Sequence, residues 1–150
     1  FSSYFTHKTG GDSIFSVEAP KIKFGRGSLN EVGDDAKALG MSRVGVFTDP
    51  RVAQQEPVAK VVESLKSNGL DVEVYDQVAV EPTDISFKQG SQFASEGKFD
   101  GFVSVGGGSV MDTCKASNLY SCYPADFLDY VTAPIGKAVP VPGALKPHIA

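Results

Sequence analysis

The sequence contains no tryptophan, two cysteines, two histidines and no long apolar run. No stretch approaches the roughly 20 apolar residues that span a bilayer, and no secretory signal core is visible. We therefore expect no membrane span. Positive charge is also scarce, because 14 Lys and Arg residues stand against 18 Asp and Glu, which gives a net charge of -4. A nucleic-acid-binding protein needs a basic surface to neutralise phosphates, so this charge balance argues against that class.

Cysteine and histidine are too sparse to predict a reactive centre. If one helix carries Cys114 and Cys122, they lie about two turns apart, roughly 12 Å along its axis. That separation exceeds the usual Cα distance of a disulfide, so we expect two reduced thiols. His7 and His148 are far apart and have no Cys or acidic partner at metal-ligand spacing. The sequence thus predicts no metal ligand and no Ser–His–Asp or Cys–His catalytic residue.

The two ends of the chain carry separate expectations. The first 13 residues, from Phe1, are hydroxyl-rich and slightly basic. Two interpretations stay open for this segment: the remnant of a cleaved mitochondrial transit peptide, or a flexible terminus without function. Near the other end, residues 134–147 are rich in Pro and Gly and predict a loop. Residues 148–150 then look like a strand that has only begun, so we expect the chain to be incomplete.

Between these ends, short apolar runs alternate with helical patterns. The expected strands cover 17–24, 43–48, 71–75 and 99–105, and the expected helices cover 28–39, 57–68, 85–96 and 109–121, with one or two helical turns at 126–131. Ser28 and Glu31 have capping-box spacing, and Asp84 can cap the third helix. Gly40, Gly69 and Gly97 are expected to end the first three helices. Alternation with short links predicts an α/β fold in which a parallel sheet is covered by helices on both faces.

The strongest local signal is the glycine turn, residues 106–109, between a buried strand and a helix. Gly106, Gly107 and Gly108 have no side chains, so their amides can approach an anion closely. The following helix points its free amides and positive dipole end at the same place. These features predict a pyrophosphate site beyond the carboxyl ends of the strands. The alternative is a tight turn in which Ser109 caps the helix and Asp112 completes a capping box.

Three further side chains are candidates at the same edge. Asp49 directly follows a buried strand, and its carboxylate can accept hydrogen bonds from both ribose hydroxyls while repelling a 2′-phosphate, which favours NAD over NADP. Turn chemistry explains Asp-Pro equally. Glu81 follows the next strand, where a simple turn is again an alternative. Lys115 can lie near a phosphate or the nicotinamide, or form an ion pair with Asp112 one turn earlier.

Taken in order, four segments resemble the amino-terminal domain of iron-containing alcohol dehydrogenases. They are Phe-Gly-Arg-Gly at 24–27, Val-Phe-Thr-Asp at 46–49, Glu-Pro-Thr at 81–83, and Gly-Gly-Gly-Ser-Val-Met-Asp-Thr-Cys-Lys-Ala at 106–116. The match starts near Ile14. Residues 116–120, 126–131 and 133–137 resemble the hydroxyacid–oxoacid transhydrogenase branch of that family, in which Glu81 also fits. The resemblance implies a Rossmann-like NAD-binding domain over residues 14–150 and a second, helical domain that holds iron or a similar divalent metal through one Asp and three His.

The resemblance further implies a function and a set of site residues. A 4-hydroxybutyrate-like hydroxyacid would give hydride to NAD, which would then reduce 2-oxoglutarate to 2-hydroxyglutarate, in a mitochondrial, homo-oligomeric enzyme with small-molecule substrates. By position, Asp49 would bind the adenosine ribose, Gly107, Gly108 and Ser109 the pyrophosphate, and Glu81 the adenosine side, although many relatives have Asn there. Asp112 and Lys115 would lie beside the cofactor. Without a metal site, the chain alone would be inactive.

Two alternatives to this enzyme remain. The first is a non-catalytic subunit derived from a dehydrogenase, whose cofactor site would be expected to decay. The intact residues 106–109, Asp112 and Lys115 favour the enzyme. The second is a related enzyme acting on a sugar-like substrate or glycerol phosphate, and the segment 127–137 argues against it.

Overall fold

The computed structural model describes residues 20–150. A four-stranded sheet has the order β2-β1-β3-β4, and all neighbouring strands are parallel. The strands are β1 (Arg43–Phe47), β2 (Asp71–Tyr75), β3 (Gly101–Ser104) and β4 (His148–Ile149). The helices are α1 (Val32–Ala38), α2 (Glu56–Ser67), α3 (Asp84–Glu96) and α4 (Gly108–Cys122), with short 3-10 helices η1 (Ser28–Glu31) and η2 (Val52–Gln54). None of the helices in this part of the chain is long and apolar enough to cross a membrane.

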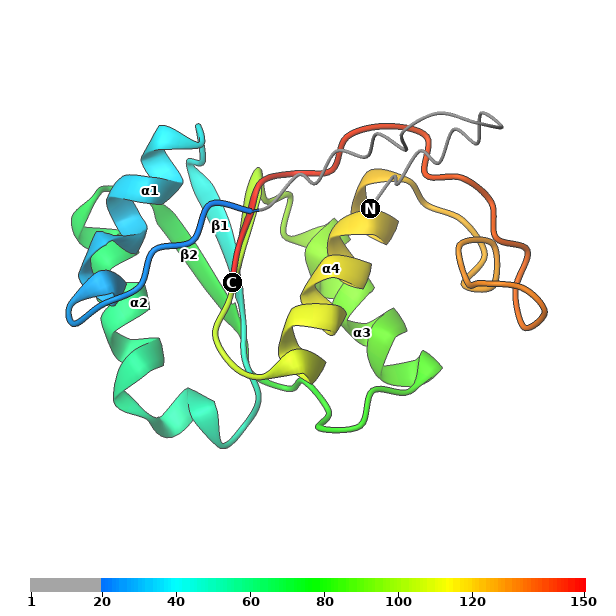
Figure 1. The fold of residues 1–150 in the computed structure, drawn as a ribbon, viewed down its shortest axis with the longest axis horizontal. Helices are drawn as coiled ribbons and strands as arrows, with labels where there is room; N and C mark the ends of the chain where they lie inside the picture. Colours follow the sequence, from blue (N-terminus) through cyan, green and yellow to red (C-terminus); the bar gives the residue numbers. More distant parts are fainter. Residues whose placement is uncertain (1–19) are drawn as a thin grey trace, which may run out of the picture.

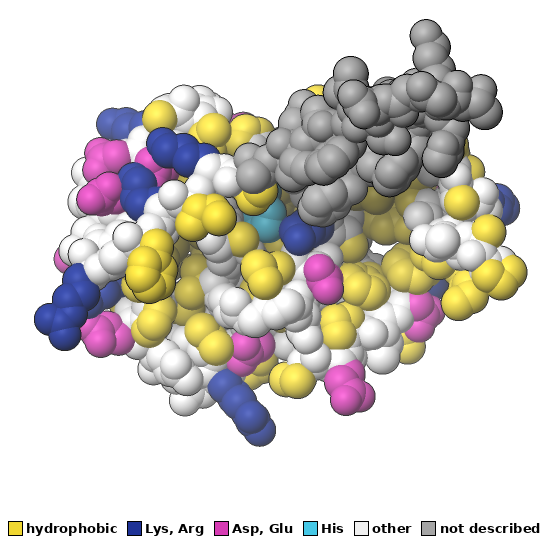
Figure 2. Space-filling model, in the orientation of Figure 1, with side chains coloured by type: hydrophobic (Ala, Val, Ile, Leu, Met, Phe, Trp, Pro, Cys, Tyr) yellow, Lys and Arg dark blue, Asp and Glu magenta, His cyan; other side chains and the backbone are white. Residues whose placement is uncertain are grey.

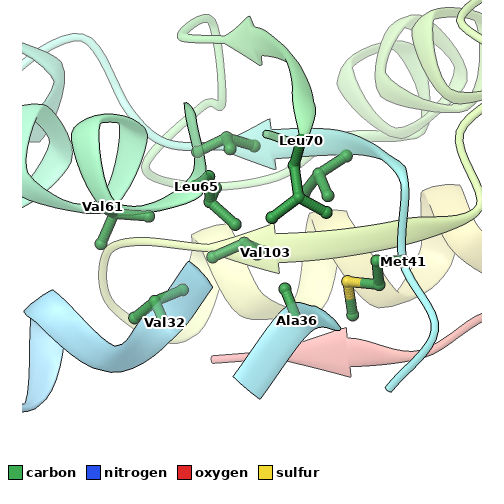
Figure 3. Close-up of a cluster of buried hydrophobic side chains, with 9 residues drawn as sticks. Val32, Ala36, Met41, Val61, Leu65, Leu70 and Val103 are labelled. Carbon is green, nitrogen blue, oxygen red and sulfur yellow. The ribbon is translucent and has the colours of Figure 1, made fainter. Parts of the chain in front are cut away.

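Helices cover both faces of the sheet, which confirms the predicted fold class. Figure 1 shows α1 and α2 on one side of the sheet and α3 and α4 on the other. The first core joins α1 and α2 to the sheet, and Figure 3 shows seven of its members with labels. Its buried residues are Val32, Ala36, Met41, Val44, Val46, Val61, Leu65, Leu70 and Val103. The second core joins α3 and α4 to the opposite face through Phe47, Val78, Ala94, Phe99, Phe102, Val110 and Cys114.

The two central strands are buried on both faces, so their side chains must alternate between the two cores. In β1, Val44 and Val46 enter the first core and Phe47 the second. Gly45 lies under aromatic rings of the second core, where an added Cβ would be 2.9 Å from a carbon of Phe99. A larger residue in the middle of β1 would therefore displace those rings.

The predicted helix stops at Gly40 and Gly69 are confirmed. Gly40 has φ +80° and Gly69 φ +78°, a backbone conformation that glycine adopts without a steric penalty. After α1, Gly40 N donates to Lys37 O at 2.9 Å and Met41 N donates to Ala36 O at 3.0 Å. This pair of bonds is a Schellman motif, which ends the helix by satisfying its last carbonyls.

Several local predictions are wrong. No side-chain hydrogen bond caps η1 or α1, so the expected capping box of Ser28 and Glu31 does not form. The Glu31 carboxylate instead accepts from Lys23 Nζ at 2.7 Å. The cap of α3 is Thr83, one residue before Asp84: its Oγ1 accepts from Ser86 N at 3.2 Å, and Thr83 N donates to Ser86 Oγ at 2.8 Å.

Other differences concern the ends of the chain. Residues 126–131 form turns and not a helix, because main-chain amides of 137–139 donate back to carbonyls of 128–131 and fold the segment into a closed loop. Residues 20–24 form no strand. The predictions for 1–13, for 14–19 and for His7 fall outside the described residues. Cys114 and Cys122 are free thiols on α4, as predicted.

Candidate nucleotide site at the carboxyl edge of the sheet

The chain leaves β1 and β3 toward opposite faces of the sheet. The segment after β1 leads to α2 and the first core, whereas the segment after β3 leads to α4 and the second core. These strands are neighbours, with Phe47 paired to Ser104 at their carboxyl ends. Such a topological switch point is where open α/β sheets bind ligands. In Figure 1 the segments that follow β1, β2 and β3 all emerge at the lower edge of the view.

Asp49 lies at the exit of β1 and is half-buried. Its Oδ1 accepts hydrogen bonds from Arg51 N at 2.9 Å and from Val52 N at 3.0 Å, which fixes the carboxylate against the start of η2. The turn interpretation is therefore confirmed. Within the described residues no donor reaches Oδ2, so this oxygen stays available to a ligand hydroxyl. Asp49 can therefore stabilise the turn through Oδ1 and still offer Oδ2 to a ribose hydroxyl.

The three glycines after β3 differ in how closely other side chains approach them. A Cβ on Gly106 would lie 2.6 Å from Val110 Cγ2, so this glycine allows Val110 to pack into the second core. Added Cβ atoms at Gly107 and Gly108 would meet nothing within 4 Å, and both residues are exposed. The corner is thus open to solvent and is not filled by side chains. This open space is where an anion could approach the backbone.

The first turn of α4 offers amide donors to that space. Gly107 is the N-cap residue, and no side chain caps the helix. The predicted alternative, with Ser109 as the cap and Asp112 completing a box, is therefore wrong. Val110 N donates to Gly107 O at 3.0 Å. The amides of Gly108 and Ser109 precede the first intrahelical bond and have no acceptor within the helix. With the helix dipole, they form a positive end suited to phosphate oxygens.

The Ser109 side chain makes a hydrogen bond within the protein. Its hydroxyl donates to the carbonyl of Val80, in the segment between β2 and α3. The bond brings that segment, including the exposed Glu81, against the glycine turn. Ser109 itself can then donate to an anion only through its main-chain amide. The structure brings Asp49, Glu81 and residues 106–109 to one edge of the sheet.

Asp112 and Lys115 lie further along α4, and both are exposed. Among the salt bridges of residues 20–150, none joins these two side chains, so the predicted ion pair is absent there. The charge of Lys115 acts instead on His148 in β4, where it helps to lower the pKa of the imidazole.

Sequence reasoning missed Thr48, which precedes Asp49. Thr48 is fully buried, and its Oγ1 donates to Val105 O at 2.8 Å. The only signal in the sequence was a hydroxyl where the apolar run of a strand ends. The distant partner could not be identified from the sequence.

Comparisons with known proteins show the family of the chain. The sequence model of iron-containing alcohol dehydrogenases matches residues 19–150. The chain belongs to the iron-containing alcohol dehydrogenase family. Over 140 residues it is 51% identical to the mitochondrial hydroxyacid-oxoacid transhydrogenase of Bos taurus, covering 93% of this chain and 30% of that protein. The probable mitochondrial transhydrogenase of Dictyostelium discoideum is 44% identical, with 97% and 28% covered. The chain thus spans about 30% of the length of such relatives.

Solved structures of the iron-containing alcohol dehydrogenase family share the fold. The NADH-dependent butanol dehydrogenase A of Thermotoga maritima matches with a TM-score of 0.69 and 29% identity, over 75% of this chain and 29% of that one. A 1,3-propanediol oxidoreductase matches with a TM-score of 0.68 and 26% identity, over 72% and 28%. Both matches confirm the predicted α/β fold class.

The metal implied by the iron-containing family does not fit the described residues. Residues 20–150 contain no group of three or more His, Cys, Asp or Glu side chains that could hold a metal ion.

A hollow of about 290 Å³ lies between α3, α4 and residues 124–127, and no residue of the glycine turn lines it. Its lining residues are Lys88, Ser91, Tyr120, Pro124, Ala125, Asp126 and Phe127.

His148, in β4, is the histidine of the described residues and is half-buried. Figure 2 shows a histidine side chain, coloured cyan, on one face of the molecule. Its Nε2 lies 2.9 Å from Ser104 Oγ, at the carboxyl end of β3. Burial, with a smaller contribution from Lys115, lowers the pKa of His148 from 6.5 to about 4. The imidazole is therefore neutral at pH 7.

We predict that His148 makes folding stability depend on pH. Because the unfolded chain binds the proton more readily, this contribution is present above pH 6.5 and is lost as the pH falls toward 4. Between pH 7 and pH 5 the loss should reach up to about 2 kcal/mol. Urea unfolding of the wild type and of His148→Leu at both pH values measures it. The leucine variant should show a smaller loss, and equal losses would contradict the prediction.

Proposed function

We propose that residues 14–150 form the NAD-binding domain of a metal-dependent dehydrogenase of this family. The observation that carries the proposal is the open glycine turn at the switch point between β1 and β3. Gly107 and Gly108 leave space there, and the first amides of α4 point into it. When bound, NAD supplies the hydride-accepting ring, and the protein supplies binding and orientation.

The residues around the turn suit the parts of the dinucleotide. Gly106, Gly107, Gly108 and the amide of Ser109 would hold the pyrophosphate. The Oδ2 oxygen of Asp49 would accept hydrogen bonds from the ribose hydroxyls, while Oδ1 stays on the amides of Arg51 and Val52.

Three further residues would lie around the same dinucleotide. Glu81, held near the turn by the bond between Ser109 and Val80, would line the adenosine side. Asp112 and Lys115 would lie further along α4, beside the bound cofactor. Both are exposed and therefore accessible to a ligand.

For the reaction, we propose hydroxyacid–oxoacid transhydrogenation in a mitochondrial enzyme. A 4-hydroxybutyrate-like acid would be oxidised to succinate semialdehyde, and 2-oxoglutarate would be reduced to 2-hydroxyglutarate. Relatives with about 50% identity carry that name and the word mitochondrial, which supports the proposal. We further propose the matrix as the compartment, a homo-oligomeric enzyme, and a divalent metal held by residues outside 20–150.

The first of three predictions from this proposed function concerns the activity of the isolated 150-residue chain. The chain should bind NAD but should not transfer hydride, because the described residues offer no metal cluster and the chain spans 30% of its relatives. The test mixes the chain with NAD, saturating 4-hydroxybutyrate and added Fe²⁺, and follows the formation of NADH by its absorbance. Metal-dependent reduction of NAD by the chain alone would refute the prediction.

The second prediction concerns the glycine turn. Gly107 has φ -85° and ψ -168°, which valine adopts readily, and its Cβ would meet no neighbour. Gly107→Val should therefore keep the fold and occupy the space of the pyrophosphate, so that NAD binding falls below detection. Calorimetric titration with NAD measures the affinity, and circular dichroism confirms folding. Ala125→Val, on an exposed residue of a different segment, is the matched control and should bind as the wild type does. Unchanged affinity of the Gly107 variant would remove the turn from the site.

The third prediction concerns the choice between NAD and NADP. Asp49→Asn keeps an Oδ1 acceptor for Arg51 N and Val52 N but removes the negative charge that would repel a 2′-phosphate. The preference for NAD over NADP should narrow by at least about tenfold, since a hydrogen bond to a charged group contributes roughly 1.5–3 kcal/mol and about 1.4 kcal/mol is a factor of ten. Paired titrations with NAD and NADP measure the ratio. Equal affinities already in the wild type would count against the ribose role of Asp49.

A further inference from the structure

Thr48 connects the exits of the three strands that surround the proposed site. Its main-chain N–H donates to Tyr75 O, the last residue of β2, at 2.9 Å, and its carbonyl accepts from Val78 N at 3.3 Å. Its side-chain Oγ1 donates to Val105 O, just after β3, at 2.8 Å. The residue is completely buried, so none of these bonds competes with water.

The side-chain bond of Thr48 lies between the two halves of the site. Asp49 is the next residue on one side of it, and Gly106 follows Val105 on the other. The main-chain ladder between β1 and β3 ends with Val105 N donating to Phe47 O at 2.9 Å. Beyond that point, among the described residues, the Thr48 hydroxyl is the hydrogen bond that still joins the two exits.

Core packing does not explain the hydroxyl. The same strand carries valine at positions 44 and 46, each fully buried. Valine has nearly the shape of threonine and would fill the position after the strand. It would also avoid burying a hydroxyl, which costs free energy unless the hydroxyl is hydrogen-bonded. The role of the Thr48 hydroxyl is therefore its hydrogen bond to the Val105 carbonyl.

We propose that Thr48 is a positioning residue for the dinucleotide, an inference that rests on the proposed NAD site. Its hydroxyl fixes the separation between the Asp49 carboxylate and the glycine turn. A ligand that touches both places gains affinity from that fixed separation, because binding at one half raises the effective concentration at the other. A ligand that touches one half gains nothing from it.

The test uses Thr48→Val with three probes: NAD, adenosine and inorganic pyrophosphate. Adenosine tests binding at Asp49, pyrophosphate tests binding at the glycine turn, and NAD tests binding at both places. We expect the Kd for NAD to rise by about tenfold, the loss that corresponds to one good hydrogen bond. The Kd values for adenosine and pyrophosphate should stay within about twofold, and Thr48→Ser, which keeps the hydroxyl, should restore NAD binding.

Thr113→Val is the matched control. Thr113 is equally buried, and its Oγ1 also donates at 2.8 Å, but to Ser109 O within α4. Helical main-chain bonds hold that turn without it, so NAD affinity should not change. If Thr48→Val does not fold, Thr48→Ala removes the same hydroxyl with less demand on space.

The outcomes separate this inference from the proposed function. Failure of the wild type to bind NAD would overturn both. Normal NAD binding by the wild type and by the hydroxyl-free variant would overturn the role of Thr48 alone. Equal loss of all three ligands would show that Thr48 only supports the local fold, which also overturns the inference.

Discussion

The pairing of β1 with β3 is the constraint on which the rest of this structure depends. Both strands are buried on both faces, and residues 44–47 of one lie against 101–104 of the other. Because the chain turns toward opposite faces after each strand, neither connection covers the edge between them. The fold therefore leaves main-chain groups accessible at one place, and it does so through topology before any particular side chain contributes.

The same packing that forms the cores also shapes the exposed corner. Val110 enters the aromatic core with Phe102 and Phe47, and that position requires a glycine at 106. Gly107 and Gly108 meet no such demand, since a Cβ at either would touch nothing. One glycine thus serves the protein interior, while two leave room for a ligand. Three consecutive glycines have two different physical causes, which the sequence alone could not separate.

Sequence reasoning succeeded where a structure depends on local chemistry. The alternation of strands and helices from β1 to α4 and the stops at Gly40 and Gly69 depend on neighbouring residues, and these were predicted. The capping box at Ser28 does not form because the N-cap residue of η1 is Gly27, and the Glu31 carboxylate pairs with Lys23. The contacts of Thr48 with Val105 and of Ser109 with Val80 join residues 57 and 29 positions apart. Such contacts depend on how the strands are ordered in the sheet, so a single sequence predicts the residues of the edge but not what holds them together.

The electrostatics of the edge explain why its geometry must be so well fixed. The chain carries a net charge of -4, and the free donors at the glycine turn are the first main-chain amides of α4. An anion at the glycine turn would then be held by main-chain amides and the dipole of α4, not by a mobile cation that could follow it. A lysine side chain adapts to a displaced phosphate, whereas amides fixed in a helix cannot. Recognition by backbone donors therefore requires that the segments around the turn keep their spacing, and buried hydroxyl groups that join one segment to another meet that requirement.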